Sequence, residues 1–183
     1  MVVVITSKDE LKSYVKLVLS SIDETTKKLL SYSNNGLNLF KDIKFTTFGV
    51  HPKDGNTPLN LIEQVNQVFT YLTTFWGIDE LKSIYTEKKF IAHLGTTGGF
   101  DIESKDDKQI CAEVFATVDP ENNKKIHNDL QRLREGNYIT KYLFYCSPIR
   151  SGINETGIII HPTTPERLID WARKLIAEDC PSP

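Results

Sequence analysis

Apolar and polar residues alternate with a period of two in two neighbouring stretches near the middle of the chain. The first stretch is 98–104, and the second is 109–118, which is rich in β-branched side chains. Such alternation predicts β-strands, and the polar residues 105–108 between them predict a turn, so the two stretches form a β-hairpin. The alternation puts Asp101 and Glu113 together on one side of this hairpin, with apolar core on the other side.

The side chains of the predicted hairpin divide between its two faces. Phe100 and Ile102 are expected to point one way and Asp101 the other, while Glu113 shares its face with Phe115. Two carboxylates in a mostly apolar pair of strands are costly unless they bind something. Paired acids also occur at exposed sheet edges, where they face water or basic side chains, and the sequence leaves both interpretations open.

Helical and strand patterns alternate along the rest of the chain. The predicted strands are 2–5, 43–50, 90–94, 138–146 and 157–160, and the predicted helices are 8–30, 58–76, 79–85, 120–134 and 165–176. A strand, a helix and a second strand in succession predict a right-handed βαβ unit. The order of elements therefore predicts an α/β fold.

Composition limits the classes of protein that this chain can belong to. The 183 residues predict one domain with a proper core, and 39% of them are hydrophobic. The formal net charge of -2 argues against a purely electrostatic nucleic-acid binder, although it allows a local basic groove. The three cysteines lack zinc-site spacing, and residues 2–5 are too short for a signal peptide or a membrane span. We therefore expect a cytoplasmic protein without a membrane partner.

The hairpin carries a short motif within a longer pattern of elements. The motif is Gly99-Phe100-Asp101-Ile102 followed by Ala112-Glu113-Val114-Phe115-Ala116, in the order helix, strand, hairpin, helix, strand. This arrangement resembles the PD-(D/E)xK nuclease superfamily over residues 59–146. The resemblance implies a restriction-endonuclease-like core, with a central mixed β-sheet flanked by helices on both faces. Residues 1–58 would then add an N-terminal helix and strand, and 147–183 a C-terminal strand and helix, to one domain.

The resemblance also implies a function. In this family an aspartate and a glutamate, here matched by Asp101 and Glu113, bind Mg²⁺, for which Mn²⁺ can substitute, and the metal activates water for phosphodiester hydrolysis. An acidic residue on the preceding helix often joins them, and Glu63 is the best match. The implied protein is a DNA endonuclease of the type II restriction class, and that class often acts as a homodimer. A polar helix face turned to water is the alternative explanation of Glu63.

The chain departs from the family at the position of the catalytic lysine, which is Phe115. Some family members carry this lysine on the following helix, where Lys124 and Lys125 are available. Helical spacing brings Lys125 closer than Lys124 to the face that holds Asn122 and Asp129, so Lys125 is the preferred candidate. Lys124, Lys125 and Asn122 are the expected nucleic-acid contacts.

Phe115 also supports a second function. A nuclease-like module that has lost its active site would bind nucleic acid or a protein partner without catalysis. Binding that does not respond to Mg²⁺ would distinguish this module from the metal-dependent enzyme.

Overall fold

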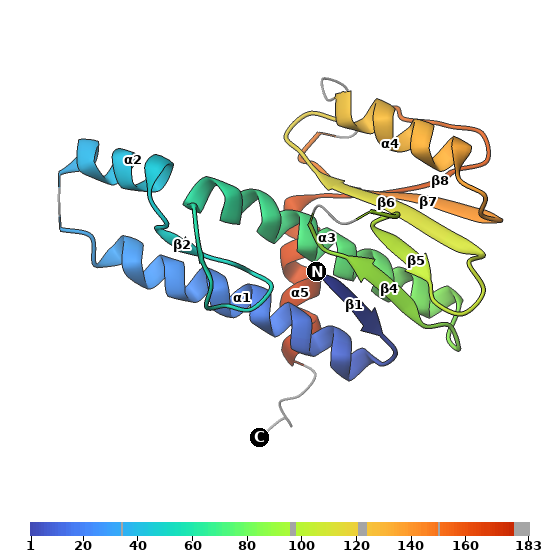
Figure 1. Cartoon of the computed structure of the whole chain (residues 1–183), viewed down its shortest axis with the longest axis horizontal. Coiled ribbons are helices and arrows are strands. Elements are labelled where there is room, and N and C mark those ends of the chain that lie inside the picture. Colours follow the sequence, from blue (N-terminus) through green and yellow to red (C-terminus); the bar gives the residue numbers. More distant parts are fainter. Residues whose placement is uncertain (34, 96–97, 121–123, 150, 178–183) are drawn as a thin grey trace.

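A six-stranded mixed β-sheet lies at the centre of the computed structural model, with helices against both of its faces (Figure 1). The structure describes residues 1–33, 35–95, 98–120, 124–149 and 151–177. The strands of the sheet are β1 (Val2–Ile5), β4 (Phe90–His93), β5 (Ile102–Ser104), β6 (Ile110–Ala116), β7 (Thr140–Cys146) and β8 (Ile159–Thr163). The helices are α1 (Lys8–Leu30), α2 (Gly36–Phe45), α3 (Leu61–Ile84), α4 (Lys124–Glu135) and α5 (Pro165–Ala177). A separate two-stranded sheet joins β2 (Gly49–Val50) and β3 (Pro58–Leu59).

The strand order in the large sheet is β1-β4-β5-β6-β7-β8. The pairs from β1 to β6 are antiparallel, whereas β6, β7 and β8 run parallel. The helix α4 connects the parallel neighbours β6 and β7, as the predicted βαβ unit requires. The predicted α/β class, with a mixed central sheet and helices on both faces, is therefore confirmed.

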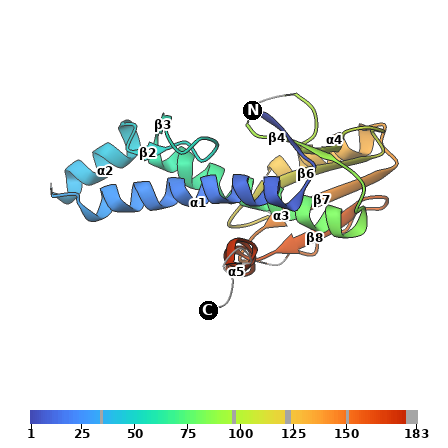
Figure 2. The same cartoon turned by 90° about the horizontal axis from the view of Figure 1, so that it is seen from below.

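The two faces of the sheet bury separate apolar cores. On β6, Ala112 and Val114 pack against α1, α3 and α5, whereas Cys111 and Phe115 pack against α4. Figure 2 shows α4 on the opposite side of the sheet from α5. Because side chains alternate along a strand, Glu113 lies on the α4 face. None of the helices in the described ranges is long and apolar enough to cross a membrane.

The start of α1 agrees with its sequence pattern. The Ser7 hydroxyl accepts a hydrogen bond from the Glu10 N–H at 3.2 Å, and the Glu10 carboxylate accepts one from the Ser7 N–H at 3.3 Å. This reciprocal capping box satisfies backbone donors that the first turn of a helix leaves unpaired.

The strand predicted at 43–50 is wrong over most of its length. Residues up to Phe45 belong to α2, whose N-cap Asn35 accepts a hydrogen bond from the Asn38 N–H at 3.0 Å. The helix start predicted at Thr57 is also wrong, because Asn60 caps α3 and accepts from the Ile62 N–H at 2.9 Å. In both places a local cap defines the helix, and apolar composition alone does not reveal it.

The helix break predicted at Gly77 is absent, since α3 continues through this residue. A Cβ atom at Gly77 would lie 3.0 Å from ring atoms of Phe144 and 3.2 Å from the Ile102 side chain. The glycine therefore allows α3 to approach the sheet closely, and its helical conformation is maintained by the packing around it.

The first strand of the predicted hairpin is shorter than 98–104. Gly99 has a φ of +102°, in the region that favours glycine, and β5 begins only at Ile102. Before Ile102, successive side chains no longer alternate between the two faces of the sheet. Ile102 is buried in the core next to α3, whereas the Phe100 ring packs 5.3 Å from the Tyr138 ring on the α4 face. The prediction that Phe100 and Ile102 share a face is wrong.

Candidate functional site

Asp101 and Glu113 lie side by side where β5 begins against β6. The register pairs Ile102 with Ala112, so one further step along the antiparallel strands sets Asp101 opposite Glu113. The two side chains interact, because Asp101 contributes to a raised pKa of Glu113. The Asp101 carboxylate also accepts a hydrogen bond from the Val114 N–H at 2.8 Å. The structure thus brings together the two acids that alternation predicts to meet, and we call them the carboxylate pair.

Burial controls the electrostatics of the carboxylate pair. The Glu113 side chain is only 1% exposed, and this burial, together with the charge of Asp101, raises the pKa of Glu113 to about 9. Arg132 lowers this pKa, but by less. Burial thus favours the protonated form of Glu113.

Arg132 of α4 supplies a positive charge next to this pair. Its Nη1 lies 3.0 Å from Oε1 of Glu113, and the arginine side chain is 49% exposed. Oε1 of Glu113 is buried and accepts no hydrogen bond, so the contact is an ion pair without good hydrogen-bond geometry. The protein itself therefore offers the carboxylate pair only one partly exposed positive charge at this place.

A second positive charge comes from Lys125, in the first turn of α4. Its Nζ donates a hydrogen bond to the Val114 carbonyl at 3.2 Å and lies 3.9 Å from Oδ2 of Asp129. The helical face predicted for Lys125 therefore does turn toward the strand that carries Glu113. The side chain of Lys124 and all of Asn122 lie outside the described residues.

Asp129 is a third acid at this place, which the sequence did not single out. Its side chain is 5% exposed, and Oδ2 accepts no hydrogen bond. Burial raises the pKa of Asp129 to about 6, even though the nearby Lys125 lowers it. The spacing of four residues between Lys125 and Asp129 is the sequence signal that could have identified it.

Phe115 and Glu63 do not contribute to the cluster of acids. Phe115 shares the α4 face of the sheet with Glu113, as predicted, but it is 1% exposed and stacks on Tyr145, with ring centroids 5.3 Å apart. Glu63 is exposed in the first turn of α3, where its charge acts on His51. The structure does not bring Glu63 to the carboxylate pair. Periodicity tells which residues of α3 share a face, but not how far along the helix the site lies, and the hollow is lined only from Asn66 onward.

A hollow of about 220 Å³ opens beside the carboxylate pair. Asp101 and Lys125 line it from one side, and a polar stripe of α3 lines it from the other, namely Asn66, Gln67, Thr70 and Thr74. Oε1 of Gln67 is buried without a hydrogen-bond partner. This polar stripe, rather than Glu63, is the part of α3 that faces the site.

His93 at the end of β4 also lines the hollow and belongs to a small polar network. Its Nε2 lies 3.2 Å from the Glu103 carboxylate, which accepts a second hydrogen bond from the Tyr138 hydroxyl at 2.8 Å. Nδ1 of His93 is buried and unpaired. The network fixes the histidine ring at the edge of the site.

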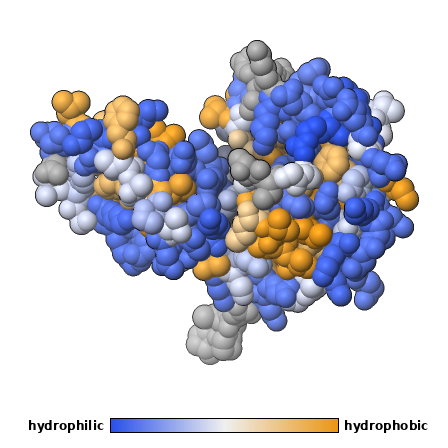
Figure 3. Space-filling view, viewed as in Figure 1, coloured by the Kyte–Doolittle hydropathy of each residue, from blue (hydrophilic) through white to orange (hydrophobic). Residues whose placement is uncertain are grey.

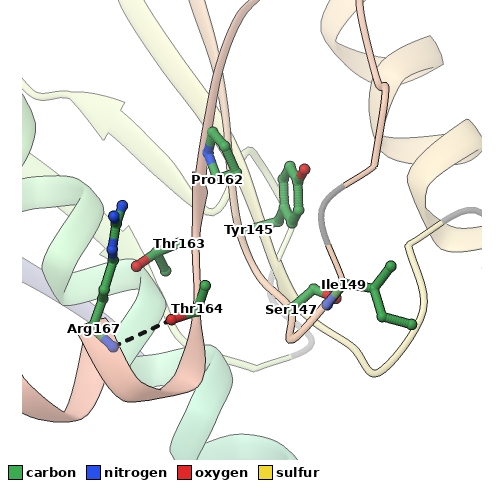
Figure 4. Close-up of a pocket in the computed structure, with 7 residues that line it drawn as sticks. All are labelled: Tyr145, Ser147, Ile149, Pro162, Thr163, Thr164 and Arg167. Carbon is green, nitrogen blue, oxygen red and sulfur yellow. Dashed lines mark hydrogen bonds between the residues drawn. The ribbon is translucent and has the colours of Figure 1, made fainter.

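A different hollow lies at the carboxyl ends of β7 and β8 (Figure 4). Tyr145, Ser147 and Arg167 are among its lining residues, and the Arg167 N–H donates to the Thr164 hydroxyl at 3.4 Å. Its volume of about 10 Å³ is close to the minimum for one water molecule. It has no room for a substrate, and none of the predicted site residues lines it.

The donors around the carboxylate pair fit a hard cation such as Mg²⁺. Among the residues that the structure describes, no group of three or more histidine, cysteine, aspartate or glutamate side chains is placed to hold a metal ion. Mg²⁺, however, usually takes only one or two protein carboxylates and keeps several waters. The buried and unpaired oxygens of Glu113 and Asp129 are acceptors of the kind that such an ion and its waters require.

No family model, no curated protein and no solved structure matches this chain. The chemistry of the site must therefore be argued from its own geometry.

Proposed function

We propose that this chain is a Mg²⁺-dependent endonuclease that hydrolyses phosphodiester bonds in DNA through a restriction-endonuclease-like core. The observation that carries the proposal is the carboxylate pair, with Asp101 and Glu113 in contact and Lys125 hydrogen-bonded to the Val114 carbonyl. The order α3, β4, β5, β6, α4, β7, with these four strands adjacent in the sheet, supports the resemblance. Lys125, which α4 supplies, is consistent with those family members in which the catalytic lysine lies on the following helix.

Each residue has a defined part in this proposal. Asp101 and Glu113 would hold Mg²⁺, which when bound supplies a water of lowered pKa and offsets charge on the phosphate. Lys125 is 48% exposed and lines the hollow, so its ammonium can hold a phosphate oxygen or the attacking water by charge. Asp129 positions Lys125 from the next turn of α4. Mn²⁺ is expected to replace Mg²⁺ because both accept oxygen ligands.

Cleavage of supercoiled plasmid DNA tests the proposal directly. We expect cleavage with Mg²⁺ or Mn²⁺, and we expect it to be lost in Asp101→Asn and Glu113→Gln, which change the charge but little of the shape. Glu63→Gln is the matched control, because this acid lies away from the pair and the variant should cleave normally. Absence of cleavage by the pure wild-type protein with either metal, on several DNA substrates, would refute the proposal.

A second candidate function is a nuclease-like module that binds nucleic acid without cutting it. The ion pair between Arg132 and Glu113 favours this reading, because the protein itself provides part of the charge that a metal would provide. Isothermal titration with Mg²⁺ or Mn²⁺ separates the two functions. The enzyme binds the metal through the carboxylate pair, whereas the module gives no heat that depends on Glu113.

A homodimer would place two such sites on the two strands of a duplex. The arm formed by the end of α1, α2 and the start of α3 exposes apolar side chains, and Figure 3 shows several hydrophobic patches on this arm, separated by hydrophilic surface. These side chains are 37–83% exposed and comprise Leu29, Leu30, Leu37, Phe40, Phe45, Ile62 and Val65. Four of them, Leu37, Phe40, Phe45 and Ile62, line one open apolar hollow between α2 and the start of α3. We propose this apolar arm surface as the contact with a second copy of the chain.

A further inference from the structure

Arg132 makes three different contacts that draw its guanidinium over the carboxylate pair. Nη1 lies 3.0 Å from Oε1 of Glu113, and Nη2 donates a hydrogen bond to the Gly99 carbonyl. The guanidinium carbon also lies 5.5 Å from the centre of the Phe100 ring, within range of a cation–π contact. The side chain is thus directed at the acids although half of it is exposed to solvent.

Arg134, on the same helix, makes a more ordinary contact than Arg132. It pairs with Glu155, with Nε 2.9 Å from the carboxylate, and both side chains are accessible to solvent. Glu113, in contrast, is 1% exposed, and its only basic partner within salt-bridge distance among the described residues is Arg132. Glu113 lies beside Asp101 and near the buried Asp129, and Arg132 is the cation that the protein itself places against it.

A divalent cation bound at Glu113 would compete with Arg132 for the charge of the same carboxylate. A metal held by Asp101 and Glu113 would lie within a few ångströms of the guanidinium, where two positive charges repel each other strongly in a buried site. The Arg132 guanidinium can move away from Glu113 into solvent, because its long side chain is already half exposed. A guanidinium at this place is also well suited to phosphate, which it binds through two parallel hydrogen bonds.

We propose that Arg132 alternates between two partners: it contacts Glu113 while no divalent cation is bound, and it binds the substrate phosphate once one is. This inference rests on the proposed function and deepens it. Arg132 is then a positioning residue that couples metal loading to nucleic-acid binding. It also explains why an ion pair with arginine is compatible with a metal site in this protein.

Accessibility of the arginine side chains tests the first half of the inference without any measurement of catalysis. The wild-type protein is treated with phenylglyoxal, with and without saturating Mg²⁺, and modification is followed by mass spectrometry at Arg132 and Arg134. We expect Arg132 to react several-fold faster with Mg²⁺ and Arg134 to be unchanged. In Glu113→Gln, Arg132 should react fast in both conditions. If calorimetry shows that Mg²⁺ binds while the reactivity of Arg132 stays constant, the inference is wrong.

Binding of a labelled DNA duplex, measured by anisotropy with and without Mg²⁺, tests the second half. We expect Mg²⁺ to lower the dissociation constant of the wild-type protein for DNA. In Arg132→Gln this gain in affinity should be about tenfold smaller, which is the effect expected for the loss of one charged hydrogen bond. Arg134→Gln changes the net charge equally and serves as the control. If both variants lose the same amount of DNA affinity, Arg132 contributes only general electrostatic attraction, and the inference is overturned. Failure of Mg²⁺ to bind the wild-type protein in calorimetry would instead refute the proposed function itself.

Discussion

The Asp101 carboxylate accepts a hydrogen bond from the backbone N–H of Val114 at 2.8 Å, which ties the start of β5 to the strand that carries Glu113. Asp101 also raises the pKa of Glu113 and lines the hollow. Asp101 therefore has two separable functions. It is an acceptor that closes a strand pair, and it is a charge that a metal ion could use.

Substitutions at Asp101 should separate these two functions. Asp101→Asn keeps an oxygen for the Val114 N–H, so we expect nearly wild-type stability together with loss of Mg²⁺ binding and cleavage. Asp101→Ala leaves that N–H without its partner and should cost a further 1–3 kcal/mol or so in the free energy of unfolding. Urea denaturation and metal titration of both variants measure the two effects. Equal destabilisation by asparagine and alanine would show that the hydrogen bond is unimportant.

Lys125 should matter for turnover more than for folding. It is half-exposed, so Lys125→Met should fold normally and bind Mg²⁺, yet cleave DNA about 10²-fold more slowly because the charge beside the phosphate is lost. Lys141→Met is the matched control. Its Nζ also caps a backbone carbonyl, that of Arg134 at 3.1 Å, but on the exposed end of β7. A cleavage rate reduced equally in the two variants would argue against a catalytic part for Lys125.

The parts of the site that sequence reasoning placed correctly depend on local periodicity. Strand alternation and an antiparallel turn suffice to bring Asp101 and Glu113 together, and helical spacing suffices to prefer Lys125. Arg132 and Asp129 were not predicted as a site because their roles depend on where α4 crosses the sheet. Glu63 failed for a different reason: it shares a helical face with Gln67, but the site meets α3 only from Asn66 onward, about one turn further along. Periodicity tells which residues share a face, but tertiary packing decides what that face meets.

The pH dependence of stability should report the buried carboxyl group of Glu113. Its pKa is raised from 4.5 to about 9, so between these values the folded protein holds a proton that the unfolded chain has released. Stability in the absence of metal therefore falls as pH rises through this window. Glu113→Gln cannot titrate, and we expect it to be more stable than wild type by about 1–3 kcal/mol at pH 8.5 and similar near pH 5.

Urea denaturation in the presence of a chelator measures this difference. Glu155→Gln is the control, because Arg134 lowers the pKa of this exposed acid and its removal should bring no gain at high pH. Parallel stability curves for the wild type and Glu113→Gln would show that Glu113 is ionised in the folded state.

Phe115 should be structural. It stands at the family's lysine position, but its ring stacks on Tyr145 at an interplanar angle of 3° inside the core beneath α4. Phe115→Lys should therefore destabilise the protein by about 3–5 kcal/mol, since it removes a buried ring and buries a charge, and it should not increase cleavage. Phe115→Leu, which keeps the site apolar, is the milder control. A stable Phe115→Lys variant that cleaves faster than wild type would mean that this position does reach the acids.

The apolar arm surface should determine the oligomeric state. Phe40 is 73% exposed on α2, a helix in which no residue is buried, so Phe40→Glu should leave the fold intact. Sedimentation velocity should show a dimer for the wild type and a monomer for this variant, because a charge in a two-fold contact is buried twice. Ile139→Glu tests an equally exposed apolar residue just before β7, 81% exposed, and should remain dimeric. A wild-type monomer at every concentration would exclude this contact. A dimer that persists in Phe40→Glu and dissociates in Ile139→Glu would place the contact on the sheet side instead.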